Sequence, residues 1–159
     1  MEMSIRAKEI LDKLLTIGFL TGSRAFGTET EHSDYDIVYS VQDSLLVSDV
    51  IKDNTKTNSE YFSGYYITIE GTRINLIPVH PHAFFPWYLA TIAMTSTYKI
   101  SGIIDPIKKY AIFEGMVALY KGMVNELFTV DYYDILKEAI LHNKLTEYNE
   151  MVRKANLPY

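Results

Sequence analysis

The sequence predicts an α+β domain, with a small mixed β-sheet packed against helices and a helical C-terminal half. Short runs rich in β-branched and aromatic residues precede Pro81, and beyond it apolar residues recur at helical spacing. The 159 residues suit one domain, and no linker-like composition divides them. We therefore expect a single domain over residues 1–159, with a sheet-bearing part over about 1–80 and a helical part over about 81–159.

The first half is expected to begin with a helix and two strands. Residues 4–16 place apolar side chains near a 3.6-residue period, and Ser4 is suited to cap this helix. The apolar residues 18–21 predict a first strand, and residues 35–41 predict a second. A short helix is expected over residues 43–51.

A β-hairpin is predicted next. After a polar loop over residues 53–59, residues 60–69 and 72–79 are rich in aromatic and β-branched side chains. Glu70 and Gly71 are then the two loop residues. This turn sets a register that pairs Ile69 with Thr72, Thr68 with Arg73, Ile67 with Ile74 and Tyr66 with Asn75.

Helices are expected throughout the second half. Residues 83–94 carry apolar side chains around most of a helical circumference, which predicts a mostly buried helix. A loop is expected over residues 98–105, with Asp105 capping the next helix and Pro106 at its first position. Further helices are expected over residues 107–123, 131–142 and 144–156.

The clearest chemistry lies between the first two predicted strands. Gly22 and Ser23 follow the first strand, where a glycine permits a tight turn whose N–H groups and hydroxyl can face an anion. Asp34 and Asp36 follow, and alternate residues of a strand point to the same face. We expect these two carboxylates to share one space while Tyr35 points the other way.

A divalent cation is the natural partner of such a carboxylate pair, because it relieves their repulsion. Mg²⁺ prefers carboxylate and phosphate oxygens together, so the Gly-Ser turn and the Asp-x-Asp pair predict a site for a metal-chelated nucleoside triphosphate. The structural alternative is an ordinary turn followed by a solvated strand end. The joint occurrence of the two motifs favours the functional interpretation.

Composition limits the other classes of function. The chain has no cysteine, which excludes disulfides, thiolate metal sites and a cysteine nucleophile. Its formal charge of −5 argues against general DNA binding, which requires a basic surface. The N-terminal residues 1–9 lack the apolar region of a signal peptide, and no apolar run is long enough for a membrane helix, so we expect no membrane partner and a cytoplasmic location.

Gly22-Ser23, the run Ser-Asp-Tyr-Asp-Ile over residues 33–37 and the predicted hairpin resemble the nucleotidyltransferase superfamily related to DNA polymerase beta. The resemblance covers about the first half of the chain. Residues 84–91 and 108–113 look similar to small nucleotidyltransferase-like proteins of bacteriophages. The resemblance implies a polymerase-beta-like sheet, and a host-cytoplasmic location if the chain is phage-encoded.

The resemblance also implies a role for each motif residue. The Gly-Ser turn would hold the triphosphate, and Asp34 and Asp36 would be catalytic residues that bind Mg²⁺, with room for two ions. Arg24 is either a phosphate clamp or an exposed structural arginine. The implied substrate-binding residues are Gly22, Ser23, Arg24, Ser33 and Asn75. The implied reaction transfers a nucleoside monophosphate from a nucleoside triphosphate, such as ATP, to a hydroxyl.

Asn75 departs from the family pattern, which usually supplies a third carboxylate from a neighbouring strand at this position. An amide can offer a carbonyl oxygen to a metal, but it carries no charge and cannot accept the proton of an attacking hydroxyl. Glu70 lies five residues away at the hairpin tip, and Glu60 fits only if its strand begins elsewhere. With asparagine at position 75, the sequence leaves open whether the chain catalyses the transfer.

Two functions remain open on the sequence alone. One is an active transferase whose acceptor is a small molecule, an RNA end or a protein. The other is a catalytically weak module that binds a nucleotide or, like an antitoxin, a partner protein. A homodimer is also left open.

Some aromatic and histidine residues have a structural and a functional interpretation. Trp87 and Phe84 are expected in the core rather than stacked on a base. His32 is expected near phosphate, and His80 and His82 as loop residues near the site mouth, because no third metal ligand accompanies them. His142 is expected at a helix end, where the dipole favours a cation.

Overall fold

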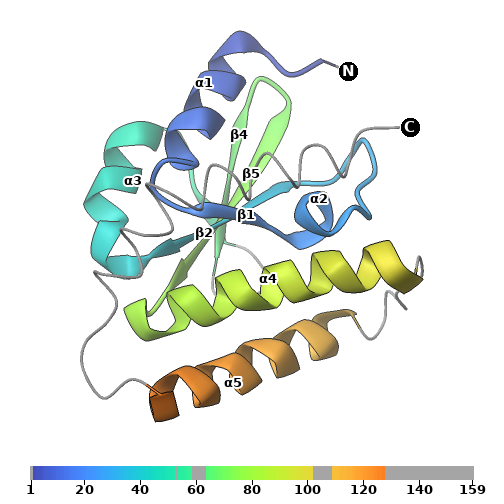
Figure 1. Ribbon diagram of the computed structural model, residues 1–159. Coiled ribbons are helices and arrows are strands. Elements are labelled where there is room, and N and C mark those ends of the chain that lie inside the picture. The colour runs from blue at the N-terminus through green and yellow to red at the C-terminus, as the bar shows by residue number, and fades with distance from the viewer. Residues whose placement is uncertain (1, 53, 59–63, 102–108, 128–159) are drawn as a thin grey trace.

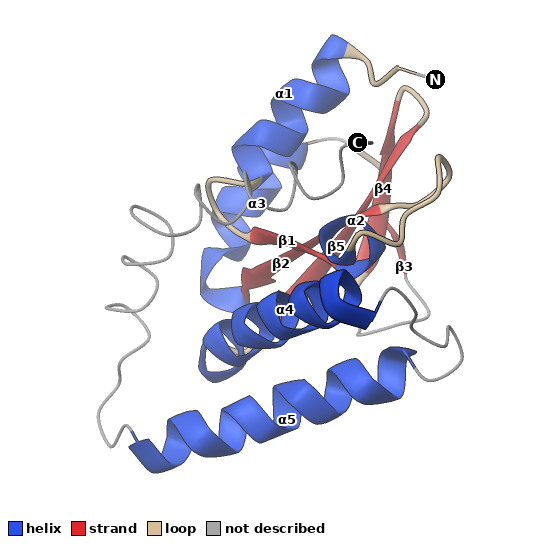
Figure 2. Ribbon diagram, turned by 45° about the vertical axis from the view of Figure 1, so that its right-hand side comes forward, coloured by secondary structure: helices blue, strands red, loops and turns tan. Residues whose placement is uncertain are grey.

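A five-stranded mixed sheet lies at the centre of the computed structural model, which describes residues 2–52, 54–58, 64–101 and 109–127. α1 (Ile5–Leu14) and α3 (Ser44–Ile51) lie on one side of the sheet and α4 (Pro81–Ser101) on the other, with α5 (Lys109–Leu127) packed against α4 (Figures 1 and 2). The predicted α+β class is confirmed. Among the described residues, no helix combines the length and the hydropathy needed to cross a membrane.

The N-terminal helix and the first two strands form as the sequence predicts. Oγ of Ser4 accepts a hydrogen bond from the backbone N–H of Ala7 at 3.1 Å and so caps α1. β1 (Phe19–Thr21) then pairs antiparallel with β2 (Tyr35–Ser40). A 3₁₀ turn, η1 (Val41–Asp43), connects β2 to α3. This arrangement brings the end of β1 next to the start of β2.

The predicted hairpin is confirmed, including its register. β4 (Tyr65–Ile69) and β5 (Thr72–Val79) are antiparallel and joined by Glu70 and Gly71. Both loop residues have positive φ, 47° and 87°, as a two-residue hairpin turn requires. The four predicted residue pairs all occur. β5 also pairs in parallel with β2, which places β5 between β4 and β2 in the sheet.

The core lies on both sides of the sheet, against α1 and α3 on one side and against α4 on the other. The ring of Phe19 on β1 meets Phe84 and Tyr88 of α4 edge-on, with centroids 5.1 and 5.5 Å apart. Two threonine hydroxyls continue this contact. Oγ1 of Thr91 lies 2.9 Å from Oγ1 of Thr21, and Oγ1 of Thr95 donates to the carbonyl of Ala25 at 3.0 Å. Helix α4 is therefore fixed to the end of β1 and to the segment that follows it.

Three segments differ from the sequence-based expectation. Residues 22–26 form a short helix, α2 (Gly22–Phe26), because Thr95 of α4 holds its Ala25 carbonyl. β3 (Thr57–Asn58) lies within the expected loop and pairs with β4, a partner that its polar sequence does not indicate. Residues 98–101 belong to α4 instead of a loop, because Tyr98 stacks on Phe26 with centroids 6.4 Å apart.

Several expectations fall on residues outside the described part of the chain. These are the helices over residues 131–142 and 144–156, the cap at Asp105 with Pro106, the possible carboxylate Glu60 and the helix-end residue His142. The helix expected over residues 107–123 is described from Lys109 to Leu127.

Candidate active site

At the junction of β1 and α2, the backbone of Gly22 lies against the carboxylate of Asp36. Gly22 has a φ of 72°, in the left-handed region that favours glycine. A Cβ atom on Gly22 would overlap Oδ2 of Asp36. The glycine is therefore required twice, for its backbone conformation and for the close approach of Asp36.

The two carboxylates of the motif line one cavity of about 330 Å³, together with Gly22 and Ser23. Asp36 lies on β2 between Thr21 of β1 and Asn75 of β5, and Asp34 precedes the strand by one residue. Tyr35, between them, does not line this cavity but a neighbouring one. The strand alternation therefore places the carboxylates together, as the sequence predicts.

Asn75 lies beside Asp36, at the position expected from the family pattern. Its Nδ2 donates a hydrogen bond to Oδ1 of Asp36 at 3.1 Å. Its Oδ1 is buried, and no described group forms a hydrogen bond with it. A Cβ built on Gly64 would lie 3.0 Å from this oxygen, so the oxygen is directed towards β4 and away from Asp36. Asn75 thus acts as a hydrogen-bond donor to the carboxylate.

Burial disfavours the ionised forms of the two carboxylates. Burial, together with a smaller contribution from repulsion by Asp34, raises the pKa of Asp36 to about 6 in spite of the Asn75 hydrogen bond. Burial also raises the pKa of Asp34, against the opposing charges of Arg73 and Arg24. An added cation would favour the ionised form of both groups.

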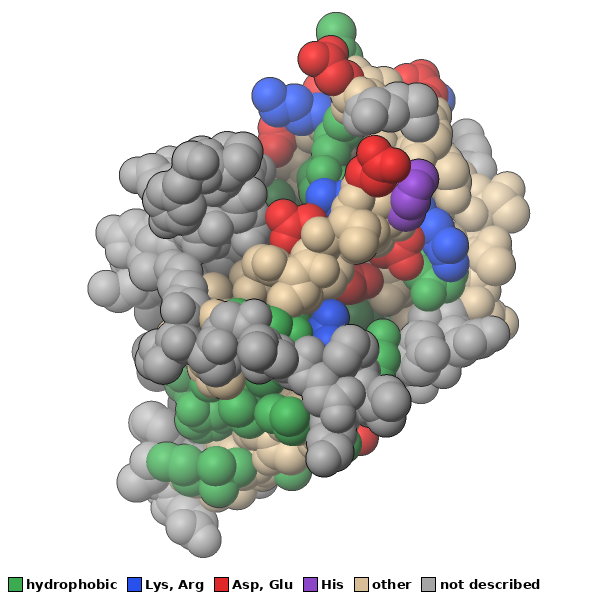
Figure 3. Space-filling view, turned by 90° about the vertical axis from the view of Figure 1, so that its right-hand side faces the viewer, with side chains coloured by type: hydrophobic (Ala, Val, Ile, Leu, Met, Phe, Trp, Pro, Cys, Tyr) green, Lys and Arg blue, Asp and Glu red, His purple; other side chains and the backbone are tan. Residues whose placement is uncertain are grey.

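Two cations lie close to these carboxylates. Nε of Arg73 is 3.4 Å from Oδ1 of Asp34, and its guanidinium lies 3.8 Å from the ring centroid of Tyr66. Lys109 of α5 lines the same cavity, with its ammonium 5.5 Å from the ring centroid of Phe26. Burial lowers the pKa of Lys109, while the nearby Asp36 raises it. Figure 3 shows acidic and basic side chains close together near the middle of this face.

Neither cation was among the predicted site residues. Arg73 could have been found, because it stands two residues before Asn75 on the same strand and alternation directs both to one face. Lys109 could not be found from local pattern. It lies on another helix and reaches the cavity only through the packing of α5 on α4.

Four aromatic side chains form an aromatic surface that lines a further part of the cavity. It consists of Phe26, Trp87, Tyr110 and Phe113. Trp87 and Phe113 meet edge-on with centroids 5.0 Å apart. Trp87 is therefore both a core residue, as predicted, and part of the cavity wall, whereas Phe84 is buried in the core. The cavity is therefore lined by both charged and aromatic side chains.

Arg24 contacts the loop that precedes β2. Its Nε donates to the carbonyl of Ser33 at 3.0 Å, and its guanidinium lies 4.1 Å from the ring centroid of Tyr35. It lines the neighbouring cavity of about 370 Å³ and not the one that holds the carboxylates. This position matches the structural alternative for Arg24 better than the phosphate clamp.

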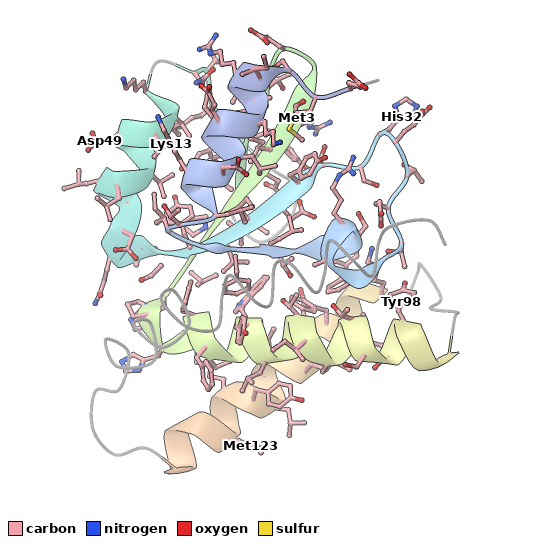
Figure 4. The ribbon with its side chains drawn as sticks, turned by 45° about the horizontal axis from the view of Figure 1, so that its top comes forward. Met3, Lys13, His32, Asp49, Tyr98 and Met123 are labelled. Carbon is pink, nitrogen blue, oxygen red and sulfur yellow. The ribbon has the colours of Figure 1, made fainter. Side chains whose placement is uncertain are left out.

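Ser33 and His32 line both cavities. Oγ of Ser33 accepts a hydrogen bond from the backbone N–H of Thr30 at 2.9 Å, which shapes the loop before β2. His32 is exposed, lies 3.2 Å from the carboxylate of Glu31 and stands at the outer bend of this loop (Figure 4). Both residues are therefore at the edge of the candidate site.

The remaining candidate ligands lie elsewhere. Glu70 is at the hairpin tip and lines only the neighbouring cavity. His80 and His82 stack on each other with centroids 5.0 Å apart, and neither lines the cavity of the carboxylates. In the part of the chain that the structure describes, no three His, Cys, Asp or Glu side chains gather as a metal site.

Comparisons of the chain with protein-family models, with curated proteins and with solved structures found no match. The case for a function therefore depends on the geometry of the cavity and on the motifs in the sequence.

Proposed function

We propose that this chain binds a Mg²⁺-chelated nucleoside triphosphate and transfers its nucleoside monophosphate to a hydroxyl acceptor. The observation that carries the proposal is the shared cavity of Asp34, Asp36 and the bare backbone of Gly22. Two carboxylates with raised pKa values gain from a cation, and phosphates of the nucleotide would complete its ligand shell. The residues present therefore fit Mg²⁺ bound together with phosphate.

The charged and the aromatic side chains of the cavity suit the phosphates and the base of a nucleotide. Arg73 and Lys109 offer positive charge to phosphate oxygens beside the carboxylates. The aromatic surface of Phe26, Trp87, Tyr110 and Phe113 offers apolar contact to a base. A cavity of about 330 Å³ lies within the range of small-molecule sites, and its opening leaves part of a nucleotide outside.

In the proposed transfer, the acceptor hydroxyl gives its proton to solvent and its oxygen forms a bond to the α-phosphorus, while the bond to the bridging oxygen breaks and pyrophosphate leaves. Bound Mg²⁺ would supply charge neutralisation for the phosphates. Asp34 and Asp36 would hold it, and Lys109 would stabilise negative charge on the leaving pyrophosphate. Asn75 cannot take the proton of the acceptor hydroxyl, because an amide is not basic at neutral pH.

Asn75 also supports the second candidate, a nucleotide-binding or antitoxin-like module with little turnover. Its amide donates to Asp36 and provides no third carboxylate. Binding of Mg²⁺ and nucleotide is common to both candidates, so it is tested first.

Calorimetry with ATP, CTP, GTP and UTP, each with and without Mg²⁺, tests the binding step. We expect Mg²⁺-dependent binding that the double substitution Asp34→Ala plus Asp36→Ala weakens at least tenfold, since it removes both metal ligands. Asp49→Ala is the matched control, because Asp49 is an exposed carboxylate of α3 on the opposite side of the sheet. Equal binding by the double variant would refute the proposed metal site.

Turnover then separates the two candidates. Purified protein with a labelled triphosphate and cell extract should release pyrophosphate and label an acceptor if the chain is a transferase. Tight, Mg²⁺-dependent binding without release of pyrophosphate would instead assign the chain to the binding module.

A further inference from the structure

Each carboxylate of the site already has one oxygen engaged by a neighbouring side chain. Oδ1 of Asp34 faces Nε of Arg73 at 3.4 Å, and Oδ1 of Asp36 accepts from Nδ2 of Asn75 at 3.1 Å. Within the described residues, no hydrogen bond or ion pair is recorded for Oδ2 of either aspartate. A metal would therefore meet Oδ2 of each carboxylate first, because a donor or a cation already faces Oδ1.

Two carboxylates suffice for one divalent ion, whereas Asn75 supplies no carboxylate for a second. Mg²⁺ takes six oxygen ligands, commonly one or two protein carboxylates with phosphates and water. A second ion would have to share these two carboxylates with the first. It would also approach the guanidinium of Arg73, and like charges a few ångströms apart repel strongly in a partly buried site.

Asn75 cannot readily turn its oxygen towards the ion. With Nδ2 bonded to Asp36, Oδ1 lies next to the backbone of Gly64, on the far side of β5. Reversing the amide would bring its oxygen against the Asp36 carboxylate and lose the one hydrogen bond that this side chain forms with the described residues.

We propose that this site holds one divalent ion per nucleotide, bound by Asp34 and Asp36, and that Asn75, which offers an amide donor in place of a carboxylate, leaves a second ion without a ligand. This inference rests on the proposed function. Lys109, on the same cavity, supplies to the phosphates part of the positive charge that a second ion would bring.

Counting bound metal tests the proposal without measuring activity. The probes are Mn²⁺ and the α,β-methylene analogue of the triphosphate that binds most tightly in calorimetry. Equilibrium dialysis gives the ratio of protein-bound Mn²⁺ to protein-bound nucleotide. We expect a ratio of one for the wild-type chain. A ratio of two overturns the inference and leaves the proposed function standing, whereas absence of nucleotide binding overturns both.

Two variants locate the cause. Asn75→Asp supplies the missing carboxylate oxygens, so the ratio should rise to two, and a folded variant that stays at one overturns the role given to Asn75. Lys109→Met should keep the ratio at one and weaken nucleotide binding about tenfold or more, because a charged partner of the phosphates is lost. A Lys109→Met variant with unchanged nucleotide affinity overturns the role given to Lys109. The wild-type ratio decides the main question even if a variant does not fold.

Discussion

The parallel pair β2–β5 has two halves that share one backbone pattern and differ in what they bury. In the half towards Ser40 and Val79, apolar pairs such as Ile37 with Leu76 are almost completely enclosed. In the half towards Tyr35, Asp36 pairs with Asn75, and burial disfavours its charge. The comparison teaches that the apolar half stabilises the sheet, and this stability allows the polar half to keep a carboxylate in an unfavourable position.

The largest expected effect comes from breaking the apolar half. Leu76→Ala should lower the free energy of unfolding by about 3 kcal/mol, because it removes a fully buried side chain and leaves a cavity. Urea denaturation measures this change. Leu45→Ala is the control, since Leu45 is 82% exposed and its truncation should change stability by less than about 0.5 kcal/mol. Similar losses in both variants would contradict the assigned core.

In the polar half, a substitution should instead raise the free energy of unfolding. Asp36→Asn should raise the free energy of unfolding by about 2 kcal/mol at pH 7, because it removes a buried charge whose pKa rises from 3.8 to about 6 on folding. The same change should weaken Mg²⁺-dependent nucleotide binding. A variant that is less stable than wild type at pH 7 would mean that the Asp36 charge is well compensated.

The pH dependence of this gain is fixed by the direction of the shift. Folding raises the pKa of Asp36, so the folded state binds the proton more tightly than the unfolded state. The stability contributed by protonated Asp36 is present below about pH 4 and is lost as the pH rises through about 6. The advantage of Asp36→Asn should therefore grow between these values and stay constant above them, as measured by denaturation across this range.

A smaller effect is expected where the polar half of the pair contacts Gly22 of α2. Gly22→Ala should lower the free energy of unfolding by about 1–2 kcal/mol, because it places a Cβ at positive φ against the Asp36 carboxylate. Gly115→Ala in α5 is the matched control, since a Cβ there meets nothing within 4 Å and alanine favours a helix. The control should raise stability by about 0.5–1 kcal/mol. Equal effects of the two changes, in thermal or urea denaturation, would contradict the close approach at Gly22.

Local pattern was sufficient for much of the fold and for part of the site. The hairpin register followed from Glu70 and Gly71, and the shared face of Asp34 and Asp36 followed from strand alternation. These features depend on residues close in sequence, so their geometry is readable without knowledge of distant contacts.

The features that sequence could not provide depend on distant contacts. α2 is fixed by the hydroxyl of Thr95, 70 residues beyond the carbonyl it binds. Lys109 reaches the cavity through helix packing, and the direction of the Asn75 amide depends on Asp36 on another strand. The sequence predicted that Asn75 lies near the two aspartates, but not that its amide nitrogen faces Asp36.

The amide at position 75 also has a genetic consequence. Both asparagine codons become aspartate codons through a change in their first base, so the three-carboxylate form is a single point mutation away. In the present form, the amide keeps its hydrogen bond to Asp36 and adds no buried negative charge. Laboratory evolution of this chain for nucleotidyl transfer would therefore meet position 75 among its shortest mutational steps.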